Sequence, residues 1–228
     1  MRVLALETCD RLGSLAALLS SPTEITLLGE TQLPHELRTA QSLLPTVQAT
    51  LDTHQWEPTS VDLVCVVTGP GSFTGLRIGV TAAKTFAYAT GAALVGVHTL
   101  AALAAAVPTQ PQRLWAILDA QRQELFAVCF SPDDSLADDP PTTQVVAIDT
   151  WLAQLAPGDA VVGPPLEGLR DRLPQGVESF DRETWKPQAS LVGRLGIERY
   201  RRGLVTDPAQ LAPQYYRRSA AEEKADGC

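Results

Sequence analysis

Glycine, proline and small hydroxyl side chains gather in one stretch of the chain, Thr68–Gly79. Its sequence is Thr-Gly-Pro-Gly-Ser-Phe-Thr-Gly-Leu-Arg-Ile-Gly, and it follows an apolar run at 61–67 that predicts a buried strand. A glycine-rich turn before a helix can bind phosphate, because the first N–H groups of a helix lack partners. The stretch has neither the Gly-Lys-Ser/Thr ending of a P-loop nor the spacing Gly-x-Gly-x-x-Gly. Phosphate binding by this loop alone is therefore the weaker interpretation.

Metal-ligating and nucleophilic residues are sparse. His35 and His54 lie near the two ends of one predicted helix, too far apart to share an ion, and His98 is best explained as the start of another helix. The four cysteines form no Cys-x-x-Cys pair, and the sequence contains neither Gly-x-Ser-x-Gly nor His-Glu-x-x-His. The sequence therefore predicts no metal site and gives a peptidase little support.

Two predicted helices flank the strand and glycine stretch and should position them. The helix at about 36–53 has a single apolar stripe with alternating three- and four-residue steps, a pattern that suits helix-on-helix contact. The second helix starts at a cap formed by Ser72 or Thr74 and ends at Gly91. Glycine costs about 1 kcal/mol against alanine inside a helix, so the glycines on its apolar face indicate that another backbone comes close. The pattern leaves open whether that backbone belongs to this chain or to a neighbour.

Bulk properties limit the class of protein. The chain has 228 residues, 45% of them hydrophobic, and a net charge of −8, which disfavours direct binding of nucleic acid or anionic lipid. No apolar run reaches the roughly 20 residues of a membrane span, and a charge follows the start too soon for a signal peptide. We expect a reduced, cytoplasmic protein without a membrane segment.

The order of the predicted elements repeats. Each half has the pattern β-β-β-α-β-α, with a boundary at Pro108–Pro111 that divides the chain into domains at 1–108 and 109–228. The second domain includes a helix at 189–202, and a polar tail that we expect to be disordered follows residue 218. Strands are predicted at 3–6, 14–19, 24–28, 61–67, 94–97, 114–118, 125–130, 145–148 and 159–162.

Several segments, in order along most of the chain, resemble the TsaB family, formerly YeaZ. They are Val3–Thr8, Leu43–Pro45, Thr68–Gly79, Gly96–Leu100, Leu118–Glu124 and Pro213–Arg217. The resemblance implies an α/β, actin-like fold of two domains, as in sugar kinases and Hsp70. It also implies a non-catalytic partner of the transferase TsaD, which makes N6-threonylcarbamoyladenosine at position 37 of tRNAs that read codons beginning with A, with the P-loop ATPase TsaE joining the complex.

TsaB and TsaD pair through the first two helices of their N-terminal domains. The resemblance thus predicts a heterodimer with a TsaD-like protein, a homodimer through the same face when the chain is alone, and contact with tRNA only through the complex. The predicted interface residues are Leu37, Ala40, Leu44, Val47, Leu51, Gly75, Gly79, Ala82, Ala83 and Phe86.

Two departures from related patterns argue against catalysis. TsaD-like chains carry two metal-binding histidines where this sequence has Thr99 and Leu103, side chains that ligate transition metals poorly. Actin-like chains place Asp-Thr after the first strand, near a bound nucleotide, where this chain has Glu7-Thr8. We expect no metal and no tightly bound cofactor, with ATP or ADP bound only weakly or at the complex interface. Candidate nucleotide or anion contacts are Glu7, Thr8, Ser72 and Arg77.

Two features allow other interpretations. The fold also suits a small-molecule kinase or ATPase, which remains the alternative function and requires tight binding of ATP and magnesium. Asp119, Arg122 and Glu124 match only part of the family's Asp-Ala-Arg-Arg-Gly-Glu, because Gln121 and Gln123 differ. We interpret this segment as a charged hairpin held by ion pairs rather than as a catalytic group.

Overall fold

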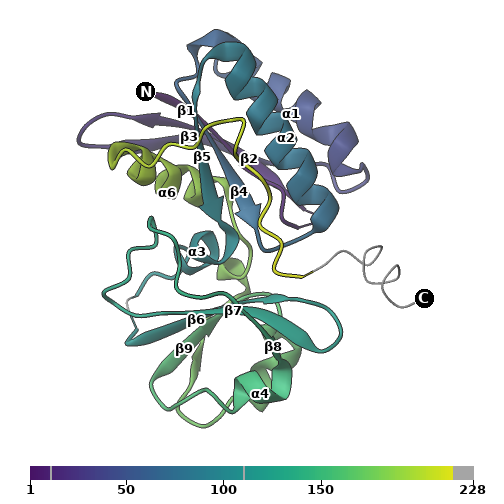
Figure 1. Cartoon of the computed structure of the whole chain (residues 1–228), viewed down its shortest axis with the longest axis vertical. Coiled ribbons are helices and arrows are strands. Elements are labelled where there is room, and N and C mark those ends of the chain that lie inside the picture. Colours follow the sequence, from purple (N-terminus) through teal and green to yellow (C-terminus); the bar gives the residue numbers. More distant parts are fainter. Residues whose placement is uncertain (11, 110, 218–228) are drawn as a thin grey trace.

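The computed structural model describes residues 1–10, 12–109 and 111–217, so the predicted tail lies outside the described residues. Two five-stranded sheets form two lobes, one above the other in Figure 1. The first has the order β3-β2-β1-β4-β5 and the second β10-β9-β6-β7-β8. Their bounds are β1 Arg2–Glu7, β2 Ser14–Ser20, β3 Ile25–Gln32, β4 Leu63–Gly69, β5 Ala93–His98, β6 Arg113–Asp119, β7 Glu124–Phe130, β8 Gln144–Ala147, β9 Asp159–Val162 and β10 Glu178–Ser179.

The two sheets share one topology. In each, the first three strands form an antiparallel meander and the fourth strand pairs parallel to the first. A fifth strand then adds in parallel at the edge, β5 in the first sheet and the very short β10 in the second. The predicted duplication and the actin-like α/β fold are confirmed. Of the ten strands in the described residues, β10 was not predicted.

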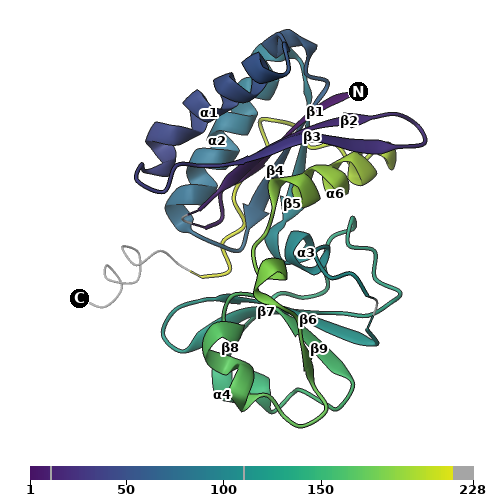
Figure 2. The same cartoon turned by 180° about the vertical axis from the view of Figure 1, so that it is seen from behind.

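Helices cover both faces of the first sheet. Helices α1 (Thr39–Thr53) and α2 (Phe73–Thr90) lie side by side on one face, and α6 (Ala189–Arg201) lies on the other (Figures 1 and 2). Strand β1 contributes side chains to both faces of the sheet, because successive side chains of a strand point to opposite sides. Leu4 and Leu6 belong to the α1–α2 core, while Val3 and Ala5 face α6.

Helix α6 changes the domain division predicted from the sequence. A boundary at 108/109 assigns it to the second domain, but it packs on β1, β2, β4 and β5 of the first sheet. Its glycines allow the approach: a Cβ at Gly193 would lie 3.2 Å from Ala5 Cβ, and one at Gly196 would overlap Cys65. The local pattern predicted the helix at 189–202 but did not show which sheet it would cover.

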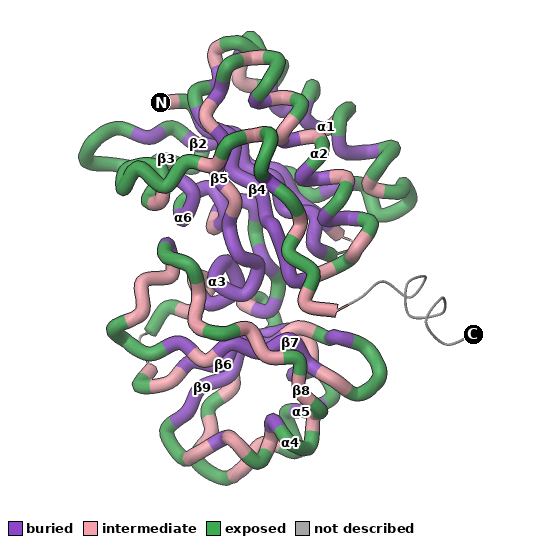
Figure 3. The backbone as a smooth tube through the Cα atoms, in the orientation of Figure 1, coloured by how far each residue is buried: buried purple, intermediate pink, exposed green. Residues whose placement is uncertain are grey.

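The second lobe has much shorter helices. In chain order, its α4 (Ile148–Leu152) and α5 (Leu166–Leu169) follow the third and fourth strands of their sheet, as α1 and α2 do in the first lobe. The six-residue α3 (Thr99–Ala104) lies between the lobes and contacts β4, β5, β6 and α6. Figure 3 shows buried strands inside both lobes and a largely exposed outer side on α1. None of the helices in the described ranges combines the length and apolarity that crossing a bilayer requires.

Candidate functional site

The glycine stretch connects β4 to α2 as predicted. Ser72 caps the helix, since its Oγ accepts a hydrogen bond from Gly75 N at 3.3 Å, and Gly91 ends it in the left-handed conformation at φ 79°. Ser72 N donates to Cys9 O at 2.7 Å, which ties the turn to the end of β1. Part of the loop's hydrogen-bonding capacity is therefore used within the chain.

The glycines of this stretch make room for other parts of the same chain. A Cβ at Gly75 or Gly79 would overlap Thr8, and one at Gly71 would lie 2.6 Å from Cys9 Cβ. At Gly69 it would lie 2.6 Å from Gln214 O. Of the two explanations left open by the sequence, packing against the chain's own backbone is the one found here. Gly75 and Gly79 thus have no free surface for a partner.

Glu7 and Thr8 lie in the interior beneath this loop. Glu7 is 1% exposed, and its Oε1 accepts a hydrogen bond from Cys9 N at 2.6 Å. Burial raises the pKa of Glu7 to about 7, because desolvation disfavours the charged form. Thr8 is fully buried, and its Oγ1 has no hydrogen-bond partner among the described residues. These two residues were predicted to contact a nucleotide, but their burial points to a packing role.

A cleft of about 690 Å³ separates the lobes next to the glycine stretch. Of the four predicted nucleotide or anion contacts, Ser72 lines it, whereas Arg77 Nε donates to the Tyr215 hydroxyl at 2.8 Å. The sequence analysis did not predict that most of the other lining residues belong to one site. It did single out two segments that contain many of them, Leu118–Glu124 and Pro213–Arg217. The polar and aromatic residues lining the cleft are Cys9, Asp10, Ser72, Phe73, Asp119, Gln121, Arg122, Phe126, Gln214, Tyr215, Tyr216 and Arg217.

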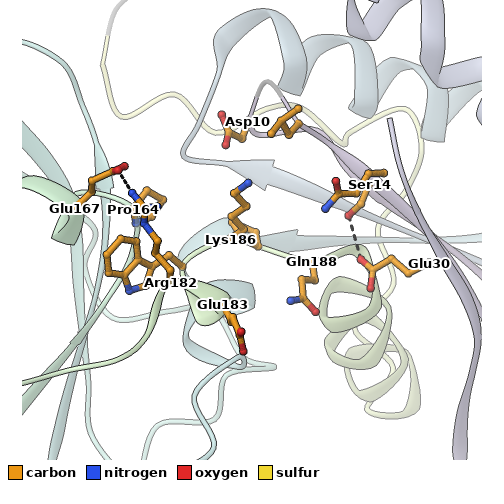
Figure 4. A pocket seen from close by; sticks show the side chains of 13 residues that line it. Asp10, Ser14, Glu30, Pro164, Glu167, Arg182, Glu183, Lys186 and Gln188 are labelled. Carbon is orange, nitrogen blue, oxygen red and sulfur yellow. Dashed lines mark hydrogen bonds and ion pairs between the residues drawn. The ribbon is translucent and has the colours of Figure 1, made fainter. Parts of the chain in front are cut away.

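The cleft continues into a second cavity of about 730 Å³, which shares Asp10, Pro164 and Pro187 with the first (Figure 4). Its walls carry both signs of charge, including an ion pair between Arg182 and Glu167. Lys186 also lines it and points toward Asp10 in Figure 4. This mixture of charges gives the cavity no strong preference for an anion or a cation.

The β6–β7 hairpin forms one wall of the cleft. Asp119 Oδ1 accepts a hydrogen bond from Gln121 N at 2.7 Å, and Glu124 Oε2 lies 3.1 Å from Arg217 Nη2. An ion pair does hold this hairpin, as the sequence suggested, but the basic residue comes from the far end of the chain. Gln121, Arg122 and Gln123 all have positive φ, at 66°, 56° and 63°.

The positions that align with metal-binding histidines lie in α3. Thr99 and Leu103 are both fully buried. His98 caps α3, as predicted, by accepting a hydrogen bond from Leu100 N at its Nδ1, and burial lowers its pKa to about 4. Within residues 1–10, 12–109 and 111–217, no group of three or more His, Cys, Asp or Glu side chains is arranged to hold a metal ion.

The predicted stripe on α1 is wrong in one respect: it divides between two sides of the helix. Val47 and Leu51 pack in the core, while Leu37 just before the helix, Ala40 and Leu44 are exposed, Leu44 at 62%. The sheet buries the arc centred on Leu43, and the next residue is turned about 100° away from it.

On α2, the predicted interface residues divide in the same way. Ala83 is fully buried, whereas Ala82 and Phe86 are half-buried at the edge of the core. Only the exposed and half-buried members of the predicted set can therefore meet a partner. We call these five residues the α1–α2 face: Leu37, Ala40, Leu44, Ala82 and Phe86.

The duplicated topology and the interlobe cleft define a two-lobed protein of the actin-like class. The family described as "TsaD: tRNA N6-adenosine threonylcarbamoyltransferase" matches residues 36–193, from just before α1 into α6. The chain belongs to the TsaB (YeaZ) branch of this family.

Three relatives illustrate the similarity. The tRNA threonylcarbamoyladenosine biosynthesis protein TsaB of Bacillus subtilis (strain 168) is 28% identical over 233 residues, covering 98% of this chain and 97% of that protein. TsaB of Escherichia coli (strain K12) is 26% identical over 194 residues, with coverages of 82% and 84%. The structure of YeaZ from Pseudomonas aeruginosa aligns with a TM-score of 0.75 at 26% identity, covering 94% of this chain and 99% of that one.

Proposed function

We propose that this protein is a non-catalytic subunit in the biosynthesis of tRNA threonylcarbamoyladenosine, where it pairs with a TsaD-like transferase. The observation that carries the proposal is the α1–α2 face, which presents apolar residues to solvent beside well-packed helices. The names of the TsaB relatives support the pathway. The residue types at 99 and 103 support the absence of catalysis, because neither can replace a metal-binding histidine.

The α1–α2 face suits a partner built in the same way. Leu37 and Leu44 are 50% and 62% exposed, and Ala40 is small enough to let another helix approach. Ala82 and Phe86 extend the apolar surface onto α2. A TsaD-like protein offering its own two helices would complete a four-helix bundle. Without that partner, a second copy of this chain can cover the same surface as a homodimer.

The net charge and the glycine stretch support the proposed roles of tRNA, nucleotide and a TsaE-like ATPase in the assembly. A net charge of −8 favours contact with tRNA through the complex rather than by this chain alone. Any ATP or ADP is bound weakly, or at the interface with the partner. A TsaE-like P-loop ATPase supplies nucleotide chemistry, which the glycine stretch of this chain is not built to perform.

Replacing Leu44 with arginine tests the pairing. A charge placed in the middle of an apolar helix interface should weaken binding of the TsaD-like partner by at least about 100-fold in calorimetric titration, because it loses its water without gaining a counter-charge. Val145→Arg is the matched control, since Val145 is an apolar residue on the second lobe with 39% exposure. Equal affinities for Leu44→Arg and the unchanged protein would contradict the proposed face.

A tRNA-modification assay tests the catalytic part of the proposal. Neither this chain nor the TsaD-like protein with TsaE should reach the rate of the complete set, and this chain by itself should form no product. Modification by this chain alone would refute the non-catalytic role.

An actin-like kinase or ATPase is the second candidate, supported by the cleft that carries Asp10 and Asp119 between the lobes. Such an enzyme requires tight binding of ATP with magnesium to the isolated chain. Calorimetry that shows micromolar or tighter ATP binding without the partner would favour it over the scaffold.

A further inference from the structure

The last described segment crosses from one lobe to the other. We define residues 204–217 as the strap, drawn in yellow across the front of Figure 1. Thr206 N donates to Leu94 O on β5 at 2.8 Å, and Gln214 N donates to Thr68 O at the end of β4 at 2.7 Å. Leu211 is buried between these two anchors, in the α1–α2 core. The strap is therefore part of the first lobe's packing before it reaches the cleft.

Side chains of α2 hold the strap along the same stretch. Lys84 Nζ donates to Leu211 O at 2.8 Å, and Arg77 Nε donates to the Tyr215 hydroxyl at 2.8 Å. The rings of Phe73 and Tyr215 lie 4.6 Å apart, with the Arg77 guanidinium 3.8 Å from the centre of Phe73. Such cation–π and ring contacts add to the hydrogen bonds. The part of α2 from Phe73 to Lys84 is thus fixed to the strap at three of its side chains.

The other end of the strap is attached to the second lobe. Arg217 Nη1 donates to Ala120 O at 2.5 Å, and Nη2 pairs with Glu124 at 3.1 Å. The Tyr216 ring meets Phe126 of β7 edge-on at 6.3 Å. All of these second-lobe residues lie in or beside the hairpin wall of the cleft.

A separate connection joins the lobes without touching α2. Arg199 of α6 donates to Ala137 O at 2.8 Å and pairs with Asp139 at 3.1 Å, both in the loop between β7 and β8. Arg199 and Arg217 therefore make the same two kinds of contact, one backbone carbonyl and one carboxylate, across the two lobes. They differ in the segment that carries them: Arg217 belongs to the strap, and Arg199 belongs to α6.

We propose that the strap couples the interlobe cleft to α2, so that movement of the β6–β7 hairpin changes the position or stability of that helix between Phe73 and Lys84. The coupling acts through Arg217 at the cleft and through Arg77 and Lys84 on α2. Since α2 also contributes Ala82 and Phe86 to the α1–α2 face, a ligand or partner that moves the lobes alters the surface offered to the transferase. This last consequence rests on the proposed function, whereas the coupling itself does not.

Hydrogen exchange of the isolated protein tests the coupling. Arg217→Ala should speed exchange at least about fivefold at Ser72 N, Leu76 N and Gln214 N, which are hydrogen-bonded in the loop, α2 and the strap. The matched control Arg199→Ala should speed exchange in the loop at 131–143 and leave those three amides unchanged. If Arg217→Ala leaves the amides of α2 unchanged, or if both variants speed them equally, the strap is no coupler.

The reverse experiment uses the α2 end. Arg77→Ala should speed exchange at Glu124 N, which donates to Gln121 O within the hairpin, because coupling between two sites is reciprocal. Glu124→Gln, which keeps the shape of the side chain and removes its charge, should act on α2 in the same direction as Arg217→Ala but more weakly. An unchanged Glu124 amide in Arg77→Ala would overturn the proposal. None of these measurements needs the transferase, so a failed coupling and a failed partner interface are separate results.

Discussion

The two lobes share one strand order but differ in the helices that cover it. In the first lobe α1 and α2 have 15 and 18 residues, whereas the corresponding α4 and α5 have 5 and 4. A long helix covers the sheet with one side and still has a second side facing outward. In the one-turn helices α4 and α5 the outward side is small and carries only the exposed residues Asp149, Thr150, Glu167 and Gly168. Within the described residues, the first lobe therefore has the broader outward helical surface, with apolar residues such as Leu44 on it.

The short helices of the second lobe bury their sheet with fewer, larger side chains. Trp151 of α4 is fully buried and meets Trp115 of β6 edge-on, with ring centres 6.4 Å apart. In the first lobe, the same task falls to leucine, valine and alanine from two long helices. The comparison predicts that single core residues matter more in the second lobe, and that outward residues of α1 matter little for stability.

The largest expected effect comes from Trp151→Ala. Removing a buried tryptophan should lower the free energy of unfolding by about 3–5 kcal/mol, through lost burial and the cavity left behind. Leu44→Ala on the exposed side of α1 should change it by less than about 0.5 kcal/mol. Urea unfolding of both variants measures the difference. A large loss in Leu44→Ala would mean that the α1–α2 face serves folding rather than binding.

The next effect concerns the buried carboxyl of the first lobe. The pKa of Glu7 is raised from an ordinary 4.5 to about 7, so the folded state holds a proton that the unfolded state releases between these values. The stability that depends on this proton is present at low pH and is lost as the pH rises through 7. Glu7→Gln removes that loss. The free energy of unfolding of the variant, relative to that of the unchanged protein, should therefore be about 2 kcal/mol greater at pH 8 than at pH 5.

Unfolding of both proteins at the two pH values checks this expectation. His98 has the opposite effect on the stability of the protein. Burial lowers the pKa of its ring from an ordinary 6.5 to about 4, so its contribution to stability is lost as the pH falls below 6.5. Because His98 is present in both proteins, its contribution cancels in the comparison. An advantage independent of pH would show that Glu7 titrates normally.

The smallest effect is expected in the β6–β7 hairpin. Gln123 has φ 63°, a conformation that costs a non-glycine residue about 1–2 kcal/mol. Gln123→Gly should therefore stabilise the protein by about 0.5–1 kcal/mol, after the greater freedom of glycine in the unfolded chain is subtracted. Gln48→Gly, in the middle of α1, should instead destabilise it by about 1 kcal/mol. Thermal unfolding of the two variants distinguishes them by sign.

Local patterns determined the elements themselves. Alternating and β-branched runs located the strands, and Gly91 and His98 marked the end of α2 and the start of α3. For the start of α2 the sequence offered Ser72 or Thr74, and Ser72 is the cap. Such signals can be found from the sequence because they depend on neighbours within a few residues. The repeated order of these elements was enough to predict the duplicated fold. The poor metal-ligating side chains of Thr99 and Leu103 were also evident from the sequence.

Contacts between distant segments were decided only by the tertiary structure. The sequence showed that the glycines of Thr68–Gly79 needed a close neighbour, but not that Thr8, Cys9 and Gln214 would fill that role. It predicted the helix at 189–202 without showing that Ser14 Oγ, 175 residues away, would accept a hydrogen bond from Ala189 N at the start of α6. It also did not show which basic residue would pair with Glu124. In the structure that residue is Arg217, at the end of the strap. Periodicity shows that a face is buried, whereas the identity of its neighbour depends on how the whole chain closes on itself.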